Sequence, residues 1–256
     1  TQLVPASGEH LGQAVDNAQR AVHGSWAVAL APAAGGQIPL GESVGKGHVV
    51  ELGAAPADLP AFRWPTGVLP ELGSAAAVAG ARCGFVERRD PRLFVLEAQP
   101  DGEQVVDLFL GLIERLPTAD NLEVRVLDHF EDAGTTDVWL TSRTNGRKII
   151  QFLDDEDVEL LANGHVEISI YLRAQAATLR LTEHKTVLFL SDNRELEDDL
   201  ARWFGELHVP RVESLVTVRD VAHFHYRGAK SRDRKKLGEE LYRQRLRKVD
   251  SVRKPA

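Results

Sequence analysis

The feature that most constrains the fold is a series of short apolar segments between residues 165 and 191. Residues 166–172 alternate apolar and polar side chains, which is the period of a strand with one buried face. Residues 179–181 and 187–190 are the next apolar segments, and the second lacks alternation, which predicts a strand buried on both faces. Because the connections are too short for a crossover helix, we expect the three strands to be antiparallel neighbours.

Helical periodicity occurs on both sides of these strands. Residues 102–116 place apolar side chains three or four positions apart, and residues 145–161 show a second helical pattern. Asp192 and Glu195 have the spacing of a capping box, which predicts a helix from there to Leu207. We therefore expect an α+β protein: a mainly antiparallel sheet with helices packed on one face, and a basic C-terminal helix.

The patterning divides the chain into three regions. Residues 1–100 are a weakly patterned N-terminal α/β region, in which four prolines between residues 56 and 73 exclude long regular elements. Residues 101–228 carry the clear strand and helix patterns and form the expected α+β domain. Residues 229–256 form a basic tail, with helical spacing from 230 to 249.

Charge is distributed unevenly along the chain. The 256 residues carry a net −7, whereas residues 227–256 contain twelve Lys or Arg and four Asp or Glu, a net +8. Residues 1–226 therefore carry −15. Such a separation of charge favours contact with another macromolecule. The residues expected to bind a polyanion or a partner are Lys230, Arg232, Arg234, Lys235, Lys236, Arg243, Arg245, Arg247 and Lys248.

The basic tail has more than one interpretation. In the first interpretation, the tail binds the acidic part of its own chain or of a second copy, or it contacts another protein. We favour self or protein contact over nucleic acid, because the acidic body repels a nucleic acid within a Debye length of about 8 Å. The alternative is salt-dependent binding of nucleic acid through the tail, with Tyr226 and Tyr242 as stacking residues.

A pair of histidines is the strongest candidate for a metal site. His223 and His225 are separated by one residue, so a strand places both imidazoles on one side. With a third ligand, such a pair holds zinc or iron. His184, in the turn of the neighbouring hairpin, is the first candidate for that ligand, and Asp128 and His129 are further ones. The competing interpretation is a strand edge whose two histidines face water or the hairpin.

A short glycine motif resembles a catalytic signature without its structural context. Residues 41–45 read Gly-Glu-Ser-Val-Gly, which matches the turn of a nucleophilic serine between a strand and a helix. Pro39 makes the preceding segment a poor strand, and Gly45 and Gly47 do not begin a stable helix. The same stretch lacks the first glycine and the final hydroxyl of a phosphate-binding loop. We expect a glycine-rich loop.

The first functional hypothesis is a non-enzymatic binding or regulatory protein, such as an immunity or inhibitor protein, acting through its acidic body and basic C-terminal helix. The alternatives are a metal-dependent enzyme at the His-x-His strand and a nucleic-acid-binding accessory protein; no specific cofactor is indicated. Cys83 is the single cysteine, which favours a reducing compartment. No apolar run approaches ~20 residues, and no signal peptide is evident. We therefore expect a cytoplasmic protein without membrane contact.

Overall fold

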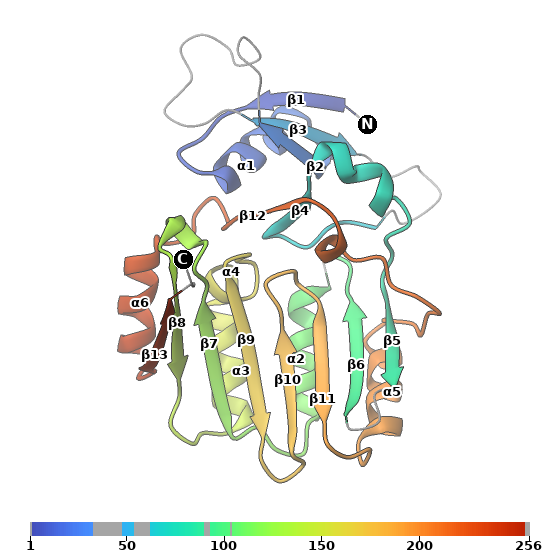
Figure 1. Cartoon of the computed structure of the whole chain (residues 1–256), viewed down its shortest axis with the longest axis vertical. Coiled ribbons are helices and arrows are strands. Elements are labelled where there is room, and N and C mark those ends of the chain that lie inside the picture. Colours follow the sequence, from blue (N-terminus) through green and yellow to red (C-terminus); the bar gives the residue numbers. More distant parts are fainter. Residues whose placement is uncertain (1, 33–47, 54–61, 90–92, 103, 254–256) are drawn as a thin grey trace.

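The fold is α+β and is dominated by one large antiparallel sheet (Figure 1). The computed structural model describes residues 2–32, 48–53, 62–89, 93–102 and 104–253. The eight strands of the sheet pair in the order β13-β8-β7-β9-β10-β11-β6-β5. They are β5 (Gly84–Arg89), β6 (Phe94–Gln99), β7 (Asn121–Val126), β8 (Thr135–Leu140), β9 (Val166–Leu172), β10 (Ala177–Leu181), β11 (Val187–Ser191) and β13 (Arg247–Arg253).

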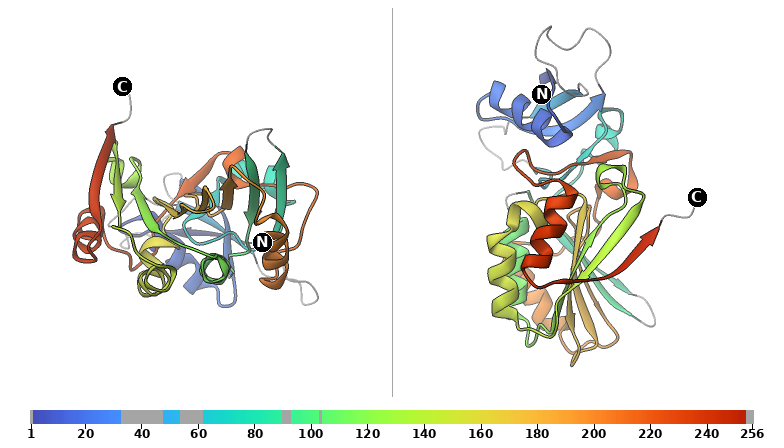
Figure 2. Two further views of the ribbon diagram at one scale, coloured as in Figure 1. Left: turned by 90° about the horizontal axis from the view of Figure 1, so that it is seen from below. Right: turned by 90° about the vertical axis from the view of Figure 1, so that its left-hand side faces the viewer.

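Helices cover one face of this sheet (Figures 1 and 2). They are α2 (Val105–Arg115), α3 (Gly146–Asp155), the short α4 (Asp157–Leu160), α5 (Glu197–Glu206) and α6 (Arg234–Arg243). Apolar residues three or four positions apart give α2 its buried face, which includes Leu108 and Leu112. These side chains join Ile170, Phe189 and Phe204 in the main hydrophobic core. The expected fold class is thus confirmed.

The register of the central strands decides which loops meet. Val126 at the end of β7 pairs with Val166 at the start of β9. Leu181 at the end of β10 pairs with Ile168, also near the start of β9. The segment after β7, the segment before β9 and the β10–β11 turn therefore lie at the same end of the sheet.

A smaller sheet at this end is formed by the N-terminal residues (Figure 1). Its strands pair antiparallel in the order β1-β3-β2, with bounds β1 (Gln2–Ala6), β2 (Trp26–Pro32) and β3 (His48–Gly53). Helix α1 (Leu11–Ala21) packs on it, and a second hydrophobic cluster lies between them. That cluster includes Ala14, Leu30, Val50 and Tyr226, so the residue that follows β12 is part of the N-terminal core.

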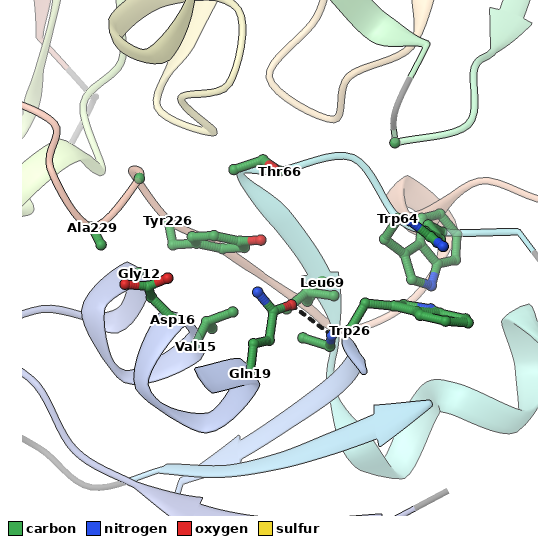
Figure 3. Close-up of a pocket in the computed structure, with 14 residues that line it drawn as sticks. Gly12, Val15, Asp16, Gln19, Trp26, Trp64, Thr66, Leu69, Tyr226 and Ala229 are labelled. Carbon is green, nitrogen blue, oxygen red and sulfur yellow. Dashed lines mark hydrogen bonds between the residues drawn. The ribbon is translucent and has the colours of Figure 1, made fainter. Parts of the chain in front are cut away.

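A two-stranded ribbon connects the two sheets. β4 (Val68–Pro70) pairs antiparallel with β12 (His223–His225), and both lie between the small sheet and the large one (Figure 1). Three 3-10 segments, η1 (Leu72–Val78), η2 (Phe130–Asp132) and η3 (Val218–Asp220), complete the described elements. The segment that follows β12 passes close to α1 at Gly12 (Figure 3). A Cβ on Gly12 would lie 1.8 Å from the Arg227 carbonyl oxygen. Gly12 is therefore required for the close packing of α1 on this segment.

Two details of the C-terminal half differ from the sequence expectations. Helix α6 ends at Arg243, and residues 247–253 form β13 beside β8, whereas a helix was expected to 249. Arg245 has a φ of 65°, and this left-handed residue ends the helical path. Strand β11 was expected to be buried on both faces, but Leu188 and Leu190 are half-buried, because the helices cover one face.

The start of α5 also differs from the expected capping box. The helix begins at Glu197 instead of directly after Asp192. The Asn193 side chain accepts a hydrogen bond of 3.0 Å from the Glu195 backbone N–H. Such local bonds compete with helix formation and hold residues 191–195 in turns.

The large sheet extends across the boundaries expected at residues 100 and 229. Strands β5 and β6 come from before residue 100, and β13 comes from the tail. The tail is therefore part of the sheet and not an appended segment. In the described ranges, no helix is both long and apolar enough to cross a bilayer.

Candidate metal centre

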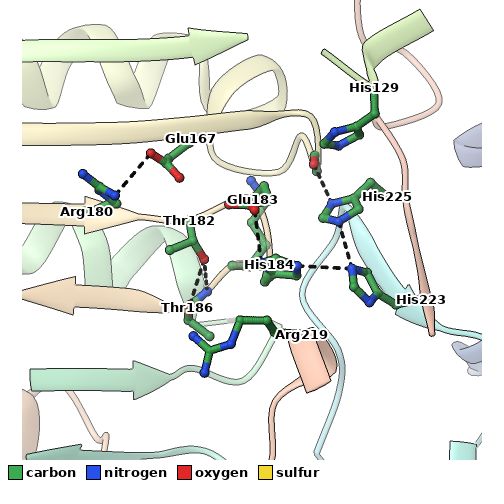
Figure 4. Close-up of polar contacts among 12 residues, drawn as sticks. His129, Glu167, Arg180, Thr182, Glu183, His184, Thr186, Arg219, His223 and His225 are labelled. Atoms are coloured by element: carbon green, nitrogen blue, oxygen red, sulfur yellow. Dashed lines mark hydrogen bonds and ion pairs between the residues drawn. The ribbon is translucent and has the colours of Figure 1, made fainter. Parts of the chain in front are cut away.

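Three histidines meet at the end of the large sheet that faces the ribbon (Figure 4). His184 lies in the turn between β10 and β11, and His223 and His225 lie on β12. The ligand nitrogens of these residues all lie within 4.8 Å of one another, and all three side chains are partly buried. The structure thus brings together the three residues named from the sequence.

The distances between the Nε2 atoms suit a small metal ion. Nε2 of His184 lies 3.2 Å from Nε2 of His223, which lies 3.0 Å from Nε2 of His225. Two nitrogens bound to a tetrahedral zinc ion at 2.0–2.1 Å lie ~3.3 Å apart. The spacing of the imidazoles is therefore close to that of zinc ligands.

The opposite nitrogen of each ring has a partner that fixes its orientation. Nδ1 of His223 donates to the Val221 carbonyl, and Nδ1 of His225 donates to the Gly164 carbonyl, both at 2.7 Å. Since a carbonyl only accepts, each Nδ1 carries the proton and each Nε2 carries a lone pair. Nδ1 of His184 lies 3.4 Å from a Glu183 carboxylate oxygen. This pattern of oriented imidazoles is typical of metal ligands.

Burial favours the neutral form of two of these rings, His184 and His225. Burial lowers the pKa of His225 to about 2, and the neighbouring imidazoles of His129, His184 and His223 act in the same direction. Burial also lowers the pKa of His184, although the Glu183 carboxylate acts in the opposite direction. Nε2 of His225 lies 3.0 Å from Nε2 of His223, so a cation at this point would be in reach of both nitrogens. The neutral forms of His184 and His225 suit the binding of a cation.

Two further histidines lie beside the three. The ring centroid of His129 is 4.7 Å from that of His225 and 4.9 Å from that of His165. His165 also stacks on Phe130 at 4.8 Å, and burial lowers its pKa to about 3. Five of the nine histidines thus gather at one end of the sheet. His165 was not identified from the sequence, and Asp128 contacts His129 at 3.6 Å without joining the three ligands.

A cavity lies next to this cluster. It has a volume of about 390 Å³ and is lined by His129, His165 and His225 together with Glu131 and Arg227. Nε2 of His129 and Nδ1 of His165 are buried, and neither has a hydrogen-bond partner among the residues that the structure describes. A small polar ligand could reach one wall of the metal site from here.

A buried lysine positions the loop on which the site depends. Lys185 is fully buried, and its Nζ donates to the carbonyls of Asn163 at 2.6 Å and Val166 at 3.3 Å. Burial lowers the pKa of Lys185 to about 7. Because Gly164 lies between the two accepting residues, the lysine fixes the carbonyl that orients His225.

The basic tail makes many contacts within its own chain. Arg232 pairs with Glu156 at 2.6 Å, and Arg234 and Lys248 both pair with Asp137, at 3.1 and 2.7 Å. Within the tail, Lys236 pairs with Asp233 at 3.3 Å and Arg243 with Glu240 at 2.8 Å. The remaining expected polyanion-binding residues are exposed: Lys230, Lys235, Arg245 and Arg247.

The other sequence candidates lie apart from this centre. Tyr226 is buried and Tyr242 is 73% exposed, so only the second presents its ring to solvent as a stacking residue would. The glycine motif at 41–45 lies outside the described residues. Comparisons with known protein families, with curated proteins and with solved structures found no match for this chain.

Proposed function

We propose that this chain binds a divalent transition-metal ion of the zinc class through Nε2 of His184, His223 and His225. The observation that carries the proposal is the convergence of three Nε2 atoms whose rings are each oriented by an acceptor at Nδ1. Three protein ligands leave a fourth tetrahedral position for water.

The type of ligand decides the type of metal. Imidazole nitrogens suit zinc, copper, iron and nickel, whereas calcium and magnesium take oxygen ligands. The converging set in the described residues consists of three imidazoles without a carboxylate or thiolate. Zn²⁺ is therefore the first ion to test.

The position of the site means that a bound ion would connect two parts of the fold. His184 belongs to the large sheet, whereas His223 and His225 belong to the ribbon that packs against the N-terminal unit. An ion bound by all three links these parts of the chain. Metal binding therefore contributes to the stability of the connection between the ribbon and the large sheet.

The contacts of the tail support self-contact more than an external polyanion. Three of its cations, Arg232, Arg234 and Lys248, pair with carboxylates that lie before residue 160 in the same chain. Charge that is neutralised in this way is not available to a nucleic acid. We therefore place metal binding ahead of electrostatic docking as the proposed function.

Metal-assisted hydrolysis is a second candidate. It is favoured by the three-ligand set, which leaves a position for water, and by the cavity of about 390 Å³ that shares His225 with the site. Zn²⁺-dependent hydrolysis of 4-nitrophenyl esters or phosphates, lost in His223→Ala, supports this candidate. Equal rates with and without the metal count against it.

The binding proposal is tested by elemental analysis and by titration of Zn²⁺ and Co²⁺ into chelator-treated protein. We expect one ion per chain and a tetrahedral Co²⁺ absorption spectrum. His223→Ala is expected to lose the ion, whereas the matched change His23→Ala, at an exposed histidine, retains it. The proposal is contradicted if the unmodified chain does not bind one metal ion, or if His223→Ala still binds one.

A further inference from the structure

A second cavity lies where the N-terminal unit meets the segments that connect it to the large sheet (Figure 3). It has a volume of about 300 Å³, at the lower end of the range for small-molecule sites. Helix α1 and strand β2 line one side, and residues 63–66 and 226–229 line the other. Two of the four tryptophans of the chain, Trp26 and Trp64, lie in its wall together with Tyr226.

A glutamine of α1 presents an oriented donor to this cavity. Oε1 of Gln19 accepts a hydrogen bond of 2.8 Å from the Ala27 backbone N–H, which fixes the carboxamide (Figure 3). The amide nitrogen therefore lies on the opposite side of the group and has no hydrogen-bond partner within the described part of the chain. Asp16 lies one turn earlier on α1 and also lines the cavity. Its Oδ2 pairs with Arg20 at 2.5 Å, which leaves Oδ1 as an acceptor.

The aromatic side chains give the cavity flat apolar walls. In Figure 3, Tyr226 lies on one side of Gln19, and the indoles of Trp26 and Trp64 lie on the other. The Arg63 guanidinium is 4.5 Å from the centroid of the Trp26 ring. A cation thus already covers this indole, which disfavours a quaternary ammonium ligand and leaves stacking to Tyr226 and Trp64. A neutral or anionic planar ligand fits these walls better.

We propose that this cavity binds a purine base, in a nucleoside or a mononucleotide. A fused-ring base stacks on aromatic side chains with either face, and the hydrogen-bonding edge of a purine carries donors and acceptors side by side. The Gln19 amide supplies the donor and Asp16 supplies the acceptor for such an edge. This inference is independent of the metal site.

The test is calorimetric titration of the full chain with guanosine, adenosine, cytidine and ribose 5-phosphate, with tryptophan fluorescence as a second readout. The purines are expected to bind, and cytidine and ribose 5-phosphate are not. Gln19→Glu keeps the acceptor for the Ala27 N–H but replaces the amide donor, and it should weaken purine binding about tenfold or more. Trp64→Leu should weaken it about tenfold through lost stacking.

A matched control lies on the same helix. Oε1 of Gln13 accepts from the Glu9 backbone N–H at 2.6 Å, and Gln13 does not line the cavity, so Gln13→Glu should leave binding unchanged. The proposal is overturned if neither purine nucleoside binds at roughly 1 mM. It is also overturned if Gln13→Glu weakens purine binding as much as Gln19→Glu does, or if ribose 5-phosphate binds as tightly as the purines. Thermal unfolding of each variant shows whether it remains folded.

Discussion

Arg234 and Asp137 form an ion pair of 3.1 Å that joins the start of α6 to β8. The Arg234 guanidinium is 12% exposed and also donates to the carbonyls of Val126, Leu127 and Thr135. One cation of the tail thus satisfies backbone groups at the end of β7 and the start of β8. A residue that the sequence assigns to a polyanion site is, in the structure, part of the interior.

Replacing Arg234 by methionine should therefore destabilise the fold strongly. The change leaves three carbonyls without this donor and weakens the neutralisation of Asp137, so we expect a loss of about 3 kcal/mol in the free energy of unfolding. Urea denaturation measures it. Lys235→Met, at the exposed neighbour, is the control and should change stability by less than about 0.5 kcal/mol. Similar effects of the two changes would refute the structural role of Arg234.

The buried Glu159 should make the free energy of unfolding depend on pH, in a direction that follows from its raised pKa. Its carboxylate is buried and accepts the Arg232 backbone N–H at 2.9 Å. Burial raises the pKa of Glu159, although the bond from the Arg232 N–H opposes this. The folded state thus binds the proton more tightly than the unfolded state. This contribution to stability is present at low pH and is lost as the pH rises through the raised pKa.

Glu159→Gln removes this titration. As the pH rises from about 4.5 towards 7, the unmodified protein should lose stability relative to the glutamine variant. Urea denaturation across this range measures the difference between the two proteins. Glu239→Gln, at an exposed position on α6, should show no such trend. A difference that is constant with pH, or that grows in the opposite direction, would show that burial of Glu159 does not govern this titration.

Part of the candidate site follows from strand topology alone. Antiparallel pairing places the β10–β11 turn beside the start of β9, so the segments that carry His184 and His165 lie at the same end of the sheet. The segment after β7 reaches the same end of the sheet, which adds His129. The sequence predicts the hairpin and nominates His184, but His165 shows no spacing to distinguish it. Its position becomes evident once the strand order is known.

Other features depend on long-range contacts that local pattern does not encode. The sequence indicates β12 through the His-x-His spacing, whereas its pairing with β4, more than 150 residues earlier, has no local signal. Residues 247–253 are strongly charged and continue a helical pattern, yet they form an edge strand because β8 offers them an unpaired edge. Tertiary pairing here outweighs local propensity.

Lys185 should support both the fold and the metal site. Lys185→Met keeps the length of the side chain but removes the donor to the carbonyls of Asn163 and Val166. Leaving buried acceptors unpaired should cost about 1–3 kcal/mol in the free energy of unfolding. Gly164 lies between these residues, and its carbonyl orients His225. Loss of the lysine should therefore disturb the orientation of His225 and lower the affinity for Zn²⁺. Calorimetry and urea denaturation measure both effects, and Lys148→Met is an exposed control.

Glu183 orients one ligand and does not belong to the ligand set. Its carboxylate lies 3.4 Å from Nδ1 of His184. Glu183→Gln should weaken Zn²⁺ binding about tenfold while one ion per chain is still bound, as for other partners of metal-bound histidines. Competition with a chelator of known affinity measures the change, and Glu195→Gln is the exposed control. Complete loss of the ion would instead make Glu183 a ligand.

Removal of the metal should loosen the ribbon before the large sheet. The ribbon is held by few strand contacts, including the bond of 2.9 Å from the Tyr226 N–H to the Gly67 carbonyl. Bound Zn²⁺ at 100 times its dissociation constant stabilises the folded state by about 2.7 kcal/mol. Chelation should therefore speed hydrogen exchange in β4 and β12 and leave β9 and β10 protected. His223→Ala should exchange at the chelated rate in either condition. Uniform protection of the ribbon with and without Zn²⁺ would show that the ion does not hold it.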